Sequence, residues 1–298
     1  MGAAALLACD WGTTNLRAWT LDVDGAVVAQ KDFPLGVSRL APGEAARRFE
    51  AEVRPALQAQ GLPAILCGMV GSNLGWAAVP YVDCPAGLGD LAARLTEVAA
   101  SVRIAPGLRC AGISGSPDVM RGEETQILGW LAQRPDRQTG RHLLCHPGTH
   151  TKWVLIEDGR VVRFVTAMTG ELFAVLGQHS VLKTDAPATD DAAFDQGLVA
   201  AGPGDALAAR LFTARARVVG GLAQADSTPS YLSGLLIGAE VASVPRLLGE
   251  SPAHVALLGD AALCDRYRRA LMAAGAEVEV FDGEAAAIAG LSALGALP

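Results

Sequence analysis

Two segments of the chain share one order of elements, and this internal repeat limits the fold more than any other feature. In residues 7–33, a strand-like apolar run, the turn DWGTTN and a second strand-like run are followed by an Asp-Gly turn and a third run. Residues 143–162, LLCHPGTHTKWVLIEDGRVV, repeat this order with a hairpin two residues shorter when Gly12 is aligned with Gly148. The repeat predicts two units that each begin with three short strands.

The first turn combines residue types that suit a phosphate group. Gly12 permits close approach of a ligand, and the N–H groups of Thr13, Thr14 and Asn15 can surround an anion together with the two threonine hydroxyls. Asp10 would repel a phosphate directly, but it can hold Mg²⁺, which then bridges to the phosphates. A plain hairpin with a solvated Asp explains this stretch equally well when it is taken alone.

The second turn strengthens the phosphate interpretation because it repeats the Gly-Thr pair. Gly148 and Thr149 are candidate phosphate ligands through their backbone. Lys152 follows on the next strand, where it would neutralise phosphate charge, although a solvated strand lysine is an equally good interpretation. Two such turns that face each other would hold one nucleotide from both sides.

Composition excludes several classes of protein. The chain has 298 residues, 51% of them hydrophobic and 18% charged, which supports two domains of ordinary size and argues against disorder. A net charge of −7 without a basic stripe argues against nucleic acid as a partner. The apolar runs are too short or too interrupted to cross a membrane, and no basic region precedes an apolar N-terminal run.

The cysteines indicate the compartment. Six are scattered through the chain without a C-x-x-C pair, so we expect reduced core residues in a cytoplasmic protein. The sequence is compatible with a homo-oligomer and does not define its size.

Six segments spread from residue 10 to residue 243 resemble one family. They are DWGTTNLRAW, GMVGSNLGW, VMRGEETQ, PGTHTKWV, MTGEL and LSGLLIGAEVAS. Together they resemble the 2-dehydro-3-deoxygalactonokinase family, within the acetate and sugar kinase/Hsp70/actin superfamily. The resemblance implies an α/β fold with two RNase H-like (actin-like ATPase) domains and an interdomain cleft. It also implies phosphorylation of the 6-hydroxyl of 2-dehydro-3-deoxy-D-galactonate by ATP with Mg²⁺.

One position departs from the superfamily pattern. The second phosphate turn usually carries an Asp where this chain has His146, so the metal-facing role falls on Asp10. We favour a hydrogen-bonding or packing role for His146 over a phosphate contact. His142, His146 and His150 are spaced as metal ligands on a helix would be, but the Pro-Gly pair between the last two excludes that helix and disfavours a zinc site.

The segment DVMRGEETQILGWLAQ predicts a helix that begins at residue 122 or 123, with Glu123 and Glu124 in its first turn. Ordinary first-turn acids are one interpretation. The other, supported by a similar G-E-E at the catalytic base of superfamily phosphatases, is that one of them accepts the proton of the sugar hydroxyl. Glu124 is expected closer to the apolar stripe of the helix, and we slightly favour Glu123 as the base.

A sugar acid presents a carboxylate and hydroxyl groups. Arg17 and Arg121 are the candidates for the carboxylate, and we favour Arg121 because it precedes the Glu pair. In the glycine-rich segment GMVGSNLGW, Ser72 and Asn73 offer hydroxyl and amide groups to a sugar, although they suit loop capping as well.

The C-terminal part contains the expected adenosine site. A strand, Gly259, a capping Asp and a helix follow one another, which in this superfamily forms the adenosine pocket. Gly234, in the preceding helix, serves either close packing or nucleotide access. The last predicted helix is apolar and is assigned to packing, with the expectation that it packs back on the first domain.

The polar segment 132–141 predicts a linker, so we divide the chain near residue 140. Residues 1–140 would form the first domain with the sugar-acid site, and residues 141–298 the second with the adenosine pocket. A kinase for a related 2-keto-3-deoxy sugar acid, and an ATPase or phosphatase on the same fold, are the alternative functions. A nucleotide-switch protein would leave the segments MVGSN and RGEET unexplained.

Overall fold

The computed structural model describes residues 2–202 and 206–297, which form two compact units. Unit 1 comprises Met1–Arg141, Ile156–Arg163 and Asp282–Pro298, and unit 2 comprises His142–Leu155 and Phe164–Phe281. The chain therefore returns to unit 1 twice after residue 141. The sequence-based division into residues 1–140 and 141–298 does not include these two later segments of unit 1.

Unit 1 contains a six-stranded sheet in the order β3-β2-β1-β4-β7-β6. Its strands are β1 (Leu6–Trp11), β2 (Leu16–Leu21), β3 (Val27–Phe33), β4 (Ala64–Cys67), β6 (Thr96–Ala99) and β7 (Val102–Ile104). The first three strands are antiparallel neighbours, as the repeat predicts, and β4 runs parallel to β1. The central strands are buried on both faces, which places the ends of β1 and β4 inside the unit.

A three-stranded sheet and several helices complete unit 1. The small sheet has the order β5-β8-β9, with β5 (Val82–Asp83), β8 (Leu108–Ala111) and β9 (Pro117–Met120). The helices are α1 (Glu44–Arg48), α2 (Arg54–Ala56), α3 (Leu88–Ala92), α4 (Glu123–Ala132) and α10 (Gly283–Ala296), with shorter helical turns η1 (Val37–Arg39), η2 (Phe49–Val53), η3 (Met69–Gly71), η4 (Ile113–Gly115) and η5 (Pro135–Gln138).

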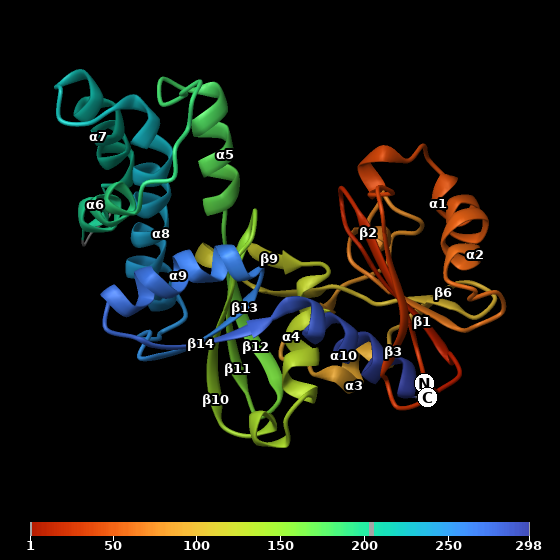
Figure 1. Cartoon of the computed structure of the whole chain (residues 1–298). Coiled ribbons are helices and arrows are strands. Elements are labelled where there is room, and N and C mark those ends of the chain that lie inside the picture. Colours follow the sequence, from red (N-terminus) through yellow and green to blue (C-terminus); the bar gives the residue numbers. More distant parts are fainter. Residues whose placement is uncertain (1, 203–205, 298) are drawn as a thin grey trace. The chain divides into compact units, whose positions relative to one another are not determined.

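The predicted packing role of the last helix is confirmed, because α10 lies along α4 inside unit 1 (Figure 1). The two backbones touch, since a Cβ on Gly129 would lie 1.9 Å from the carbonyl oxygen of Ala286. Residues 132–141, by contrast, are not a free linker. The guanidinium of Arg137 is buried over the ring of Trp130 and donates to the carbonyl oxygen of that residue.

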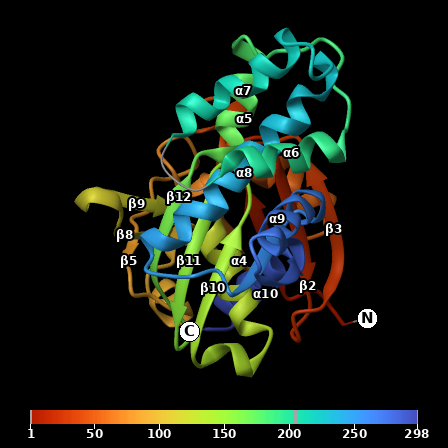
Figure 2. The ribbon, with the colours of Figure 1, turned by 90° about the vertical axis from the view of Figure 1, so that its left-hand side faces the viewer.

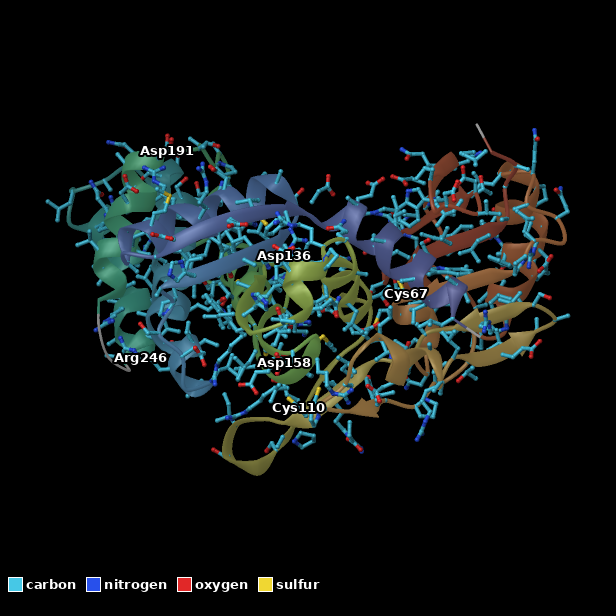
Figure 3. The ribbon with its side chains drawn as sticks, turned by 90° about the horizontal axis from the view of Figure 1, so that it is seen from below. Cys67, Cys110, Asp136, Asp158, Asp191 and Arg246 are labelled. Atoms are coloured by element: carbon cyan, nitrogen blue, oxygen red, sulfur yellow. The ribbon has the colours of Figure 1, made fainter. Side chains whose placement is uncertain are left out.

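Unit 2 is built on a five-stranded sheet in the order β12-β11-β10-β13-β14. Its strands are β10 (Arg141–His146), β11 (Thr151–Glu157), β12 (Arg160–Ala167), β13 (His254–Gly259) and β14 (Glu277–Asp282). The second hairpin and its third strand thus form as the repeat predicts. Asp158, labelled in Figure 3, lies in the turn between β11 and β12, whose ends are grouped with unit 1.

The helices of unit 2 gather beyond one end of its sheet, except α9, which lies beside β13 (Figure 2). They are α5 (Thr169–His179), α6 (Asp191–Ala201), α7 (Leu207–Val219), α8 (Thr228–Leu247) and α9 (Ala261–Ala273), with the turn η6 (Ala225–Ser227). The long helix α8 is the centre of this group, because α5, α6, α7 and α9 all pack against it. Among residues 2–202 and 206–297, no helix combines the length and the apolar character that a bilayer crossing requires.

Candidate active site

Three segments of unit 1 meet at Asp10. This residue lies near the end of β1 beside Cys67, its register partner on the parallel strand β4 (Figure 3 labels Cys67). A Cβ on Gly68 would lie 3.2 Å from Oδ1 of Asp10, and a Cβ on Gly122 would lie 3.2 Å from the Cα of Gly68. The loops that follow parallel strands share one edge of a sheet, where ligands of α/β proteins bind. Asp10 therefore occupies the position expected of a functional carboxylate.

The two glutamates of the RGEET segment have different environments, although they are adjacent. Glu124 is fully buried, and its carboxylate accepts hydrogen bonds from the backbone N–H of Gly122 (2.6 Å) and the hydroxyl of Thr125 (3.2 Å). Burial raises its pKa to about 8. Glu123 is partly exposed and accepts a hydrogen bond from the backbone N–H of Arg121. As predicted, Glu124 faces the packed stripe and Glu123 flanks it.

Glu123 and Asp10 act on each other electrostatically. The pKa of Asp10 is raised to about 6, mainly by burial; the charge of Arg17 opposes this rise and the charge of Glu123 adds to it. Arg17 stands opposite Asp10 in the register of β1 and β2. Its guanidinium is half exposed, 4.0 Å from the carboxylate of Glu284 on α10. Two carboxylates and a guanidinium therefore share one region of unit 1, which suits a site for a cation and phosphate groups.

The first turn is held in a defined shape. The N–H of Gly12 donates to the carbonyl oxygen of Asn15 over 2.9 Å, which closes the turn. Thr13, Thr14 and Asn15 are exposed on it. The indole of Trp11, one residue before the turn, is buried and donates to the carbonyl oxygen of Leu35. The predicted phosphate ligands of unit 1 thus project from a rigid base.

The glycine-rich loop after β4 lies against Arg121. A Cβ on Gly71 would lie 2.9 Å from Nη1 of Arg121, whose Nη2 donates to the carbonyl oxygen of Val79. The guanidinium stacks 4.3 Å from the ring centre of Tyr81. Its Nε and Nη1 atoms are buried and find no hydrogen-bond acceptor in the part of the chain that the structure describes. Because arginine keeps its proton, these are strong donors available to a carboxylate.

The two polar residues of that loop differ in their contacts. Ser72 closes the local turn, because its hydroxyl donates to the carbonyl oxygen of Met69 over 2.7 Å and accepts from the N–H of Leu74. Asn73 is exposed. The contacts of Ser72 therefore match the alternative interpretation, in which this residue caps the loop.

The second turn opens onto a cavity inside unit 2. The cavity has a volume of about 250 Å³. Gly148 and Thr149 line one side of it, and Arg266 contributes a cation that also donates to the hydroxyl of Ser233 over 3.2 Å. The remaining lining residues come from α5, α8 and α9 and are Thr169, Gly170, Phe173, Leu236, Ile237, Leu263 and Tyr267. A mostly apolar cavity with a few polar groups at one end is the usual form of a small-molecule site.

A buried carboxylate, that of Glu240, is hydrogen-bonded to the cavity-lining residue Tyr267. Glu240, on α8, accepts hydrogen bonds from the indole of Trp153 (2.7 Å) and the hydroxyl of Tyr267 (2.9 Å). The hydroxyl of Tyr267 also bonds that of Thr151 on β11. Burial raises the pKa of Glu240, and a hydrogen bond from Thr169 opposes the shift. Strand β11, helix α9 and the start of α5 are therefore tied to one side chain.

The predicted nucleotide residues of unit 2 are distributed unevenly around the cavity. Gly234 does not line it; a Cβ there would lie 2.0 Å from the carbonyl oxygen of Phe194 on α6, so this glycine serves close helix packing. Gly259 ends β13, and a Cβ on it would lie 3.5 Å from the carbonyl oxygen of Pro147.

The side chain of Lys152 is only 4% exposed, which excludes the interpretation of this residue as a solvated strand lysine. His146, at the end of β10, is partly buried.

Comparison with known proteins identifies the family. The 2-keto-3-deoxy-galactonokinase family profile matches residues 10–294. The chain belongs to this family. A 2-dehydro-3-deoxygalactonokinase of Escherichia coli (strain K12) is 36% identical over 293 residues, covering 98% of this chain and 97% of that one. A Rhizobium meliloti (strain 1021) protein named a probable 2-dehydro-3-deoxygalactonokinase is 39% identical over 297 residues, covering 96% of this chain and 95% of that one.

Solved structures agree with this membership. A crystal structure from Sinorhizobium meliloti, provisionally described as a 2-dehydro-3-deoxygalactonokinase, has a TM-score of 0.87 and 38% identity, and each chain is covered to 97%. The activator of 2-hydroxyisocaproyl-CoA dehydratase from Clostridium difficile has a TM-score of 0.50 at 12% identity, covering 99% of this chain and 94% of that one. The predicted α/β fold of the actin-like ATPases with RNase H-like domains is confirmed; the interdomain cleft stays a prediction.

Several residues that line or support the cavity carry no functional signal in the motifs that predict the site, among them Thr169, Arg266, Tyr267 and Glu240. One signal for Glu240 was present, because it is the only acidic residue of the 20-residue helix α8. An acid inside an otherwise apolar helix is buried only when it is hydrogen-bonded, so it marks a polar cluster. Arg266 and Tyr267 lie in an ordinary amphipathic helix and carry no such signal.

Proposed function

We propose that this protein transfers the γ-phosphoryl group of ATP to the 6-hydroxyl of 2-dehydro-3-deoxy-D-galactonate, with release of ADP. The observation that carries the proposal is the family match over residues 10–294, which includes every residue around Asp10 described above. A reaction that consumes ATP fits a cytoplasmic protein. The 2-keto-3-deoxy acids that differ at one hydroxyl remain the alternative substrates.

In this proposal, both Gly-Thr turns bind phosphate groups of ATP through backbone N–H groups and threonine hydroxyls. The cavity of unit 2 then receives the adenosine. Its apolar lining suits the base, and Arg266, the one cationic lining residue, suits a polar group of the nucleotide. Lys152, a buried residue of β11, is the proposed cation for these phosphate groups.

We assign the divalent metal to Asp10. Among the described residues, no group of three or more His, Cys, Asp or Glu side chains is arranged to hold a metal ion. This fits Mg²⁺, which usually takes one or two protein carboxylates and completes its shell with phosphate oxygens and water. The bound metal would neutralise charge on the transferring phosphoryl group. Arg17, which opposes the raised pKa of Asp10, would keep that carboxylate ionised when the site is empty of nucleotide.

Glu123 is the proposed general base. It is the partly exposed member of the pair and acts electrostatically on Asp10, so it faces the region where we place the phosphate groups. It would accept the proton of the sugar 6-hydroxyl as the oxygen attacks phosphorus. Glu124 is buried and hydrogen-bonded to Gly122, so its role is to fix the loop that presents Glu123.

The carboxylate of the sugar acid is assigned to Arg121. Its two buried donors without an acceptor in the described part of the chain support this choice over Arg17, which lies beside Asp10. Each of these donors can form a charge-assisted hydrogen bond with a carboxylate. Asn73, exposed in the adjacent loop, is the candidate for a sugar hydroxyl.

A coupled assay of ADP release tests the function. The purified chain is supplied with ATP, Mg²⁺ and each of a panel of 2-keto-3-deoxy sugar acids. We expect ADP release to depend on the sugar acid and to be fastest with the galactonate derivative. Equal ADP formation without any sugar acid would instead identify an ATPase.

A further inference from the structure

Each of the two Gly-Thr turns is backed by a glycine from the segment that follows its third strand. Strand β3 ends at Phe33, and Gly36 is the third residue after it; strand β12 ends at Ala167, and Gly170 is the third residue after it. Both glycines lie against the turn that begins their own repeat. The contact recurs although the residues around the two glycines differ.

In unit 1, residues 36–38 donate hydrogen bonds to the carbonyl oxygens of Gly12, Thr13 and Thr14. The N–H groups of Gly36, Val37 and Ser38 donate to the carbonyl oxygens of Thr14 (3.0 Å), Gly12 (3.1 Å) and Thr13 (3.1 Å), respectively. The hydroxyl of Ser38 donates to the oxygen of Thr13 as well, over 2.7 Å. The turn is therefore held from one side by four hydrogen bonds.

This arrangement requires glycine. A Cβ on Gly36 would lie 2.1 Å from the carbonyl carbon of Thr14 and 2.2 Å from the carbonyl oxygen of Thr13. Both atoms belong to the backbone, so no side-chain rotation relieves the clash. Any larger residue must displace the turn.

Unit 2 repeats the contact at the start of α5. A Cβ on Gly170 would lie 2.4 Å from the carbonyl oxygen of Gly148 and 2.7 Å from the Cα of Thr149. The N–H of the next residue, Glu171, donates to the carbonyl oxygen of Thr149 over 3.0 Å. The side chain of Glu171 also bonds His150 at the end of the turn.

The two contacts share the backing glycine and the threonine carbonyl that accepts a hydrogen bond. When Gly12 is aligned with Gly148, Thr13 aligns with Thr149, and each threonine carbonyl accepts an N–H from the segment that follows its backing glycine. The interval from Gly12 to Gly36 exceeds that from Gly148 to Gly170 by two residues, the same two by which the second hairpin is shorter.

We propose that Gly36 and Gly170 are positioning residues, which orient the backbone N–H groups of the two turns toward the phosphates of the nucleotide. The inference rests on the proposed function, because it takes the turns to be phosphate sites. The C=O and N–H of a trans peptide point in opposite directions. Holding the three carbonyl oxygens of unit 1 on one side therefore turns the N–H groups of Thr13, Thr14 and Asn15 to the other.

Titration calorimetry of the full chain with ADP and Mg²⁺ tests the proposal. Gly36→Ala and Gly170→Ala are each expected to raise the Kd for ADP or the KM for ATP by about tenfold or more, because misplacement of a ligand-binding group by about 1 Å has large effects. The KM for the sugar acid should change much less. Gly89→Ala in α3 and Gly177→Ala in α5 are matched controls, since a Cβ at either position meets nothing within 4 Å.

A milder variant covers the case in which Gly36→Ala does not fold. Ser38 is exposed, and Ser38→Ala removes only the hydroxyl bond to Thr13, so we expect an unchanged Tm and a Kd for ADP raised about threefold to tenfold. Nucleotide affinities equal to those of the wild type in Ser38→Ala and in both folded glycine variants would overturn the positioning role. If the wild-type chain itself binds no ADP, the proposed function fails instead.

Discussion

Trp153 on β11 donates its indole N–H to the carboxylate of Glu240 on α8 over 2.7 Å, and both side chains are buried. The same carboxylate accepts the hydroxyl of Tyr267, which lines the cavity of unit 2. One side chain thus joins the strand after the second Gly-Thr turn to the floor of the proposed adenosine site.

Replacement of Glu240 separates this supporting role from a catalytic one. Glu240→Ala removes the acceptor of the buried N–H of Trp153 and leaves the hydroxyl of Tyr267 bonded only to that of Thr151, which costs on the order of 2–5 kcal/mol of unfolding free energy. Glu240→Gln keeps one acceptor and should lose less. Urea denaturation measures the loss, and the KM for ATP should rise more than the KM for the sugar acid. Full stability of the alanine variant would contradict the cluster's structural role.

Replacement of Glu123 tests the general base. Glu123→Gln should lower kcat by about 10²- to 10⁴-fold, because proton transfer from the attacking hydroxyl is lost, while the KM for ATP changes little. Glu124→Gln is the matched control on the neighbouring residue. An equal loss of kcat in both variants, with both folded, would refute the assignment of the base to Glu123.

Ionisation of Asp10 should appear in the pH dependence of the reaction. Its pKa is raised to about 6, mainly by burial, so the free enzyme loses this negative charge as the pH falls through about 6. We expect kcat/KM for ATP to fall below that pH, and the corresponding pKa in kcat to be lower, because bound metal favours the ionised carboxylate. Asp10→Asn should reduce activity by on the order of 100-fold and abolish this acidic limb. Persistence of the limb in that variant would assign it to another group.

Arg121 should determine affinity for the sugar acid. Arg121→Met is expected to raise the KM for the sugar acid by about 10- to 100-fold, the loss of one charge-assisted hydrogen-bonded contact, with little change in the KM for ATP. Arg17→Met should raise the KM for ATP more than the KM for the sugar acid, because Arg17 lies beside Asp10 in the register of the first hairpin. Steady-state kinetics with each substrate varied in turn distinguishes the two results. A raised KM for the sugar acid in Arg17→Met alone would exchange the two assignments.

Glu124 should make the folded chain less stable as the pH rises. Its pKa is about 8 in the folded protein and 4.5 in the ordinary carboxyl, so the folded state binds more protons between these values. The contribution to stability is therefore fully present below about pH 4.5 and is lost as the pH rises through about 8. Glu124→Gln mimics the protonated form at every pH. Between pH 5.5 and pH 8, the unfolding free energy of the wild type should therefore decrease by a few kcal/mol more than that of Glu124→Gln. Parallel curves from urea denaturation would show that Glu124 does not carry this dependence.

Local sequence patterns determined the elements of this protein well. The strand-turn-strand repeats, the helix that begins at Glu123 and the strand-glycine-helix unit at Gly259 all form as predicted. These features depend on turn residues, helix caps and hydrophobic periodicity within about 20 residues, so they can be predicted without knowledge of distant contacts. The difference between Glu123 and Glu124 also follows from helix geometry, since adjacent residues point about 100° apart.

Tertiary structure decided what the local patterns left open. Gly234 serves either packing or a nucleotide by its spacing alone, and only the carbonyl oxygen of Phe194 on a neighbouring helix resolves the choice. Burial of Lys152, the acceptor-free donors of Arg121 and the cluster around Glu240 likewise depend on residues far away in the chain. The sequence by itself determined the two repeated hairpins, the helix at Glu123 and the strand-glycine-helix unit at Gly259. The packing of distant backbones determined which polar groups are buried, paired or open to a ligand, because desolvation depends on the whole surrounding shell of atoms.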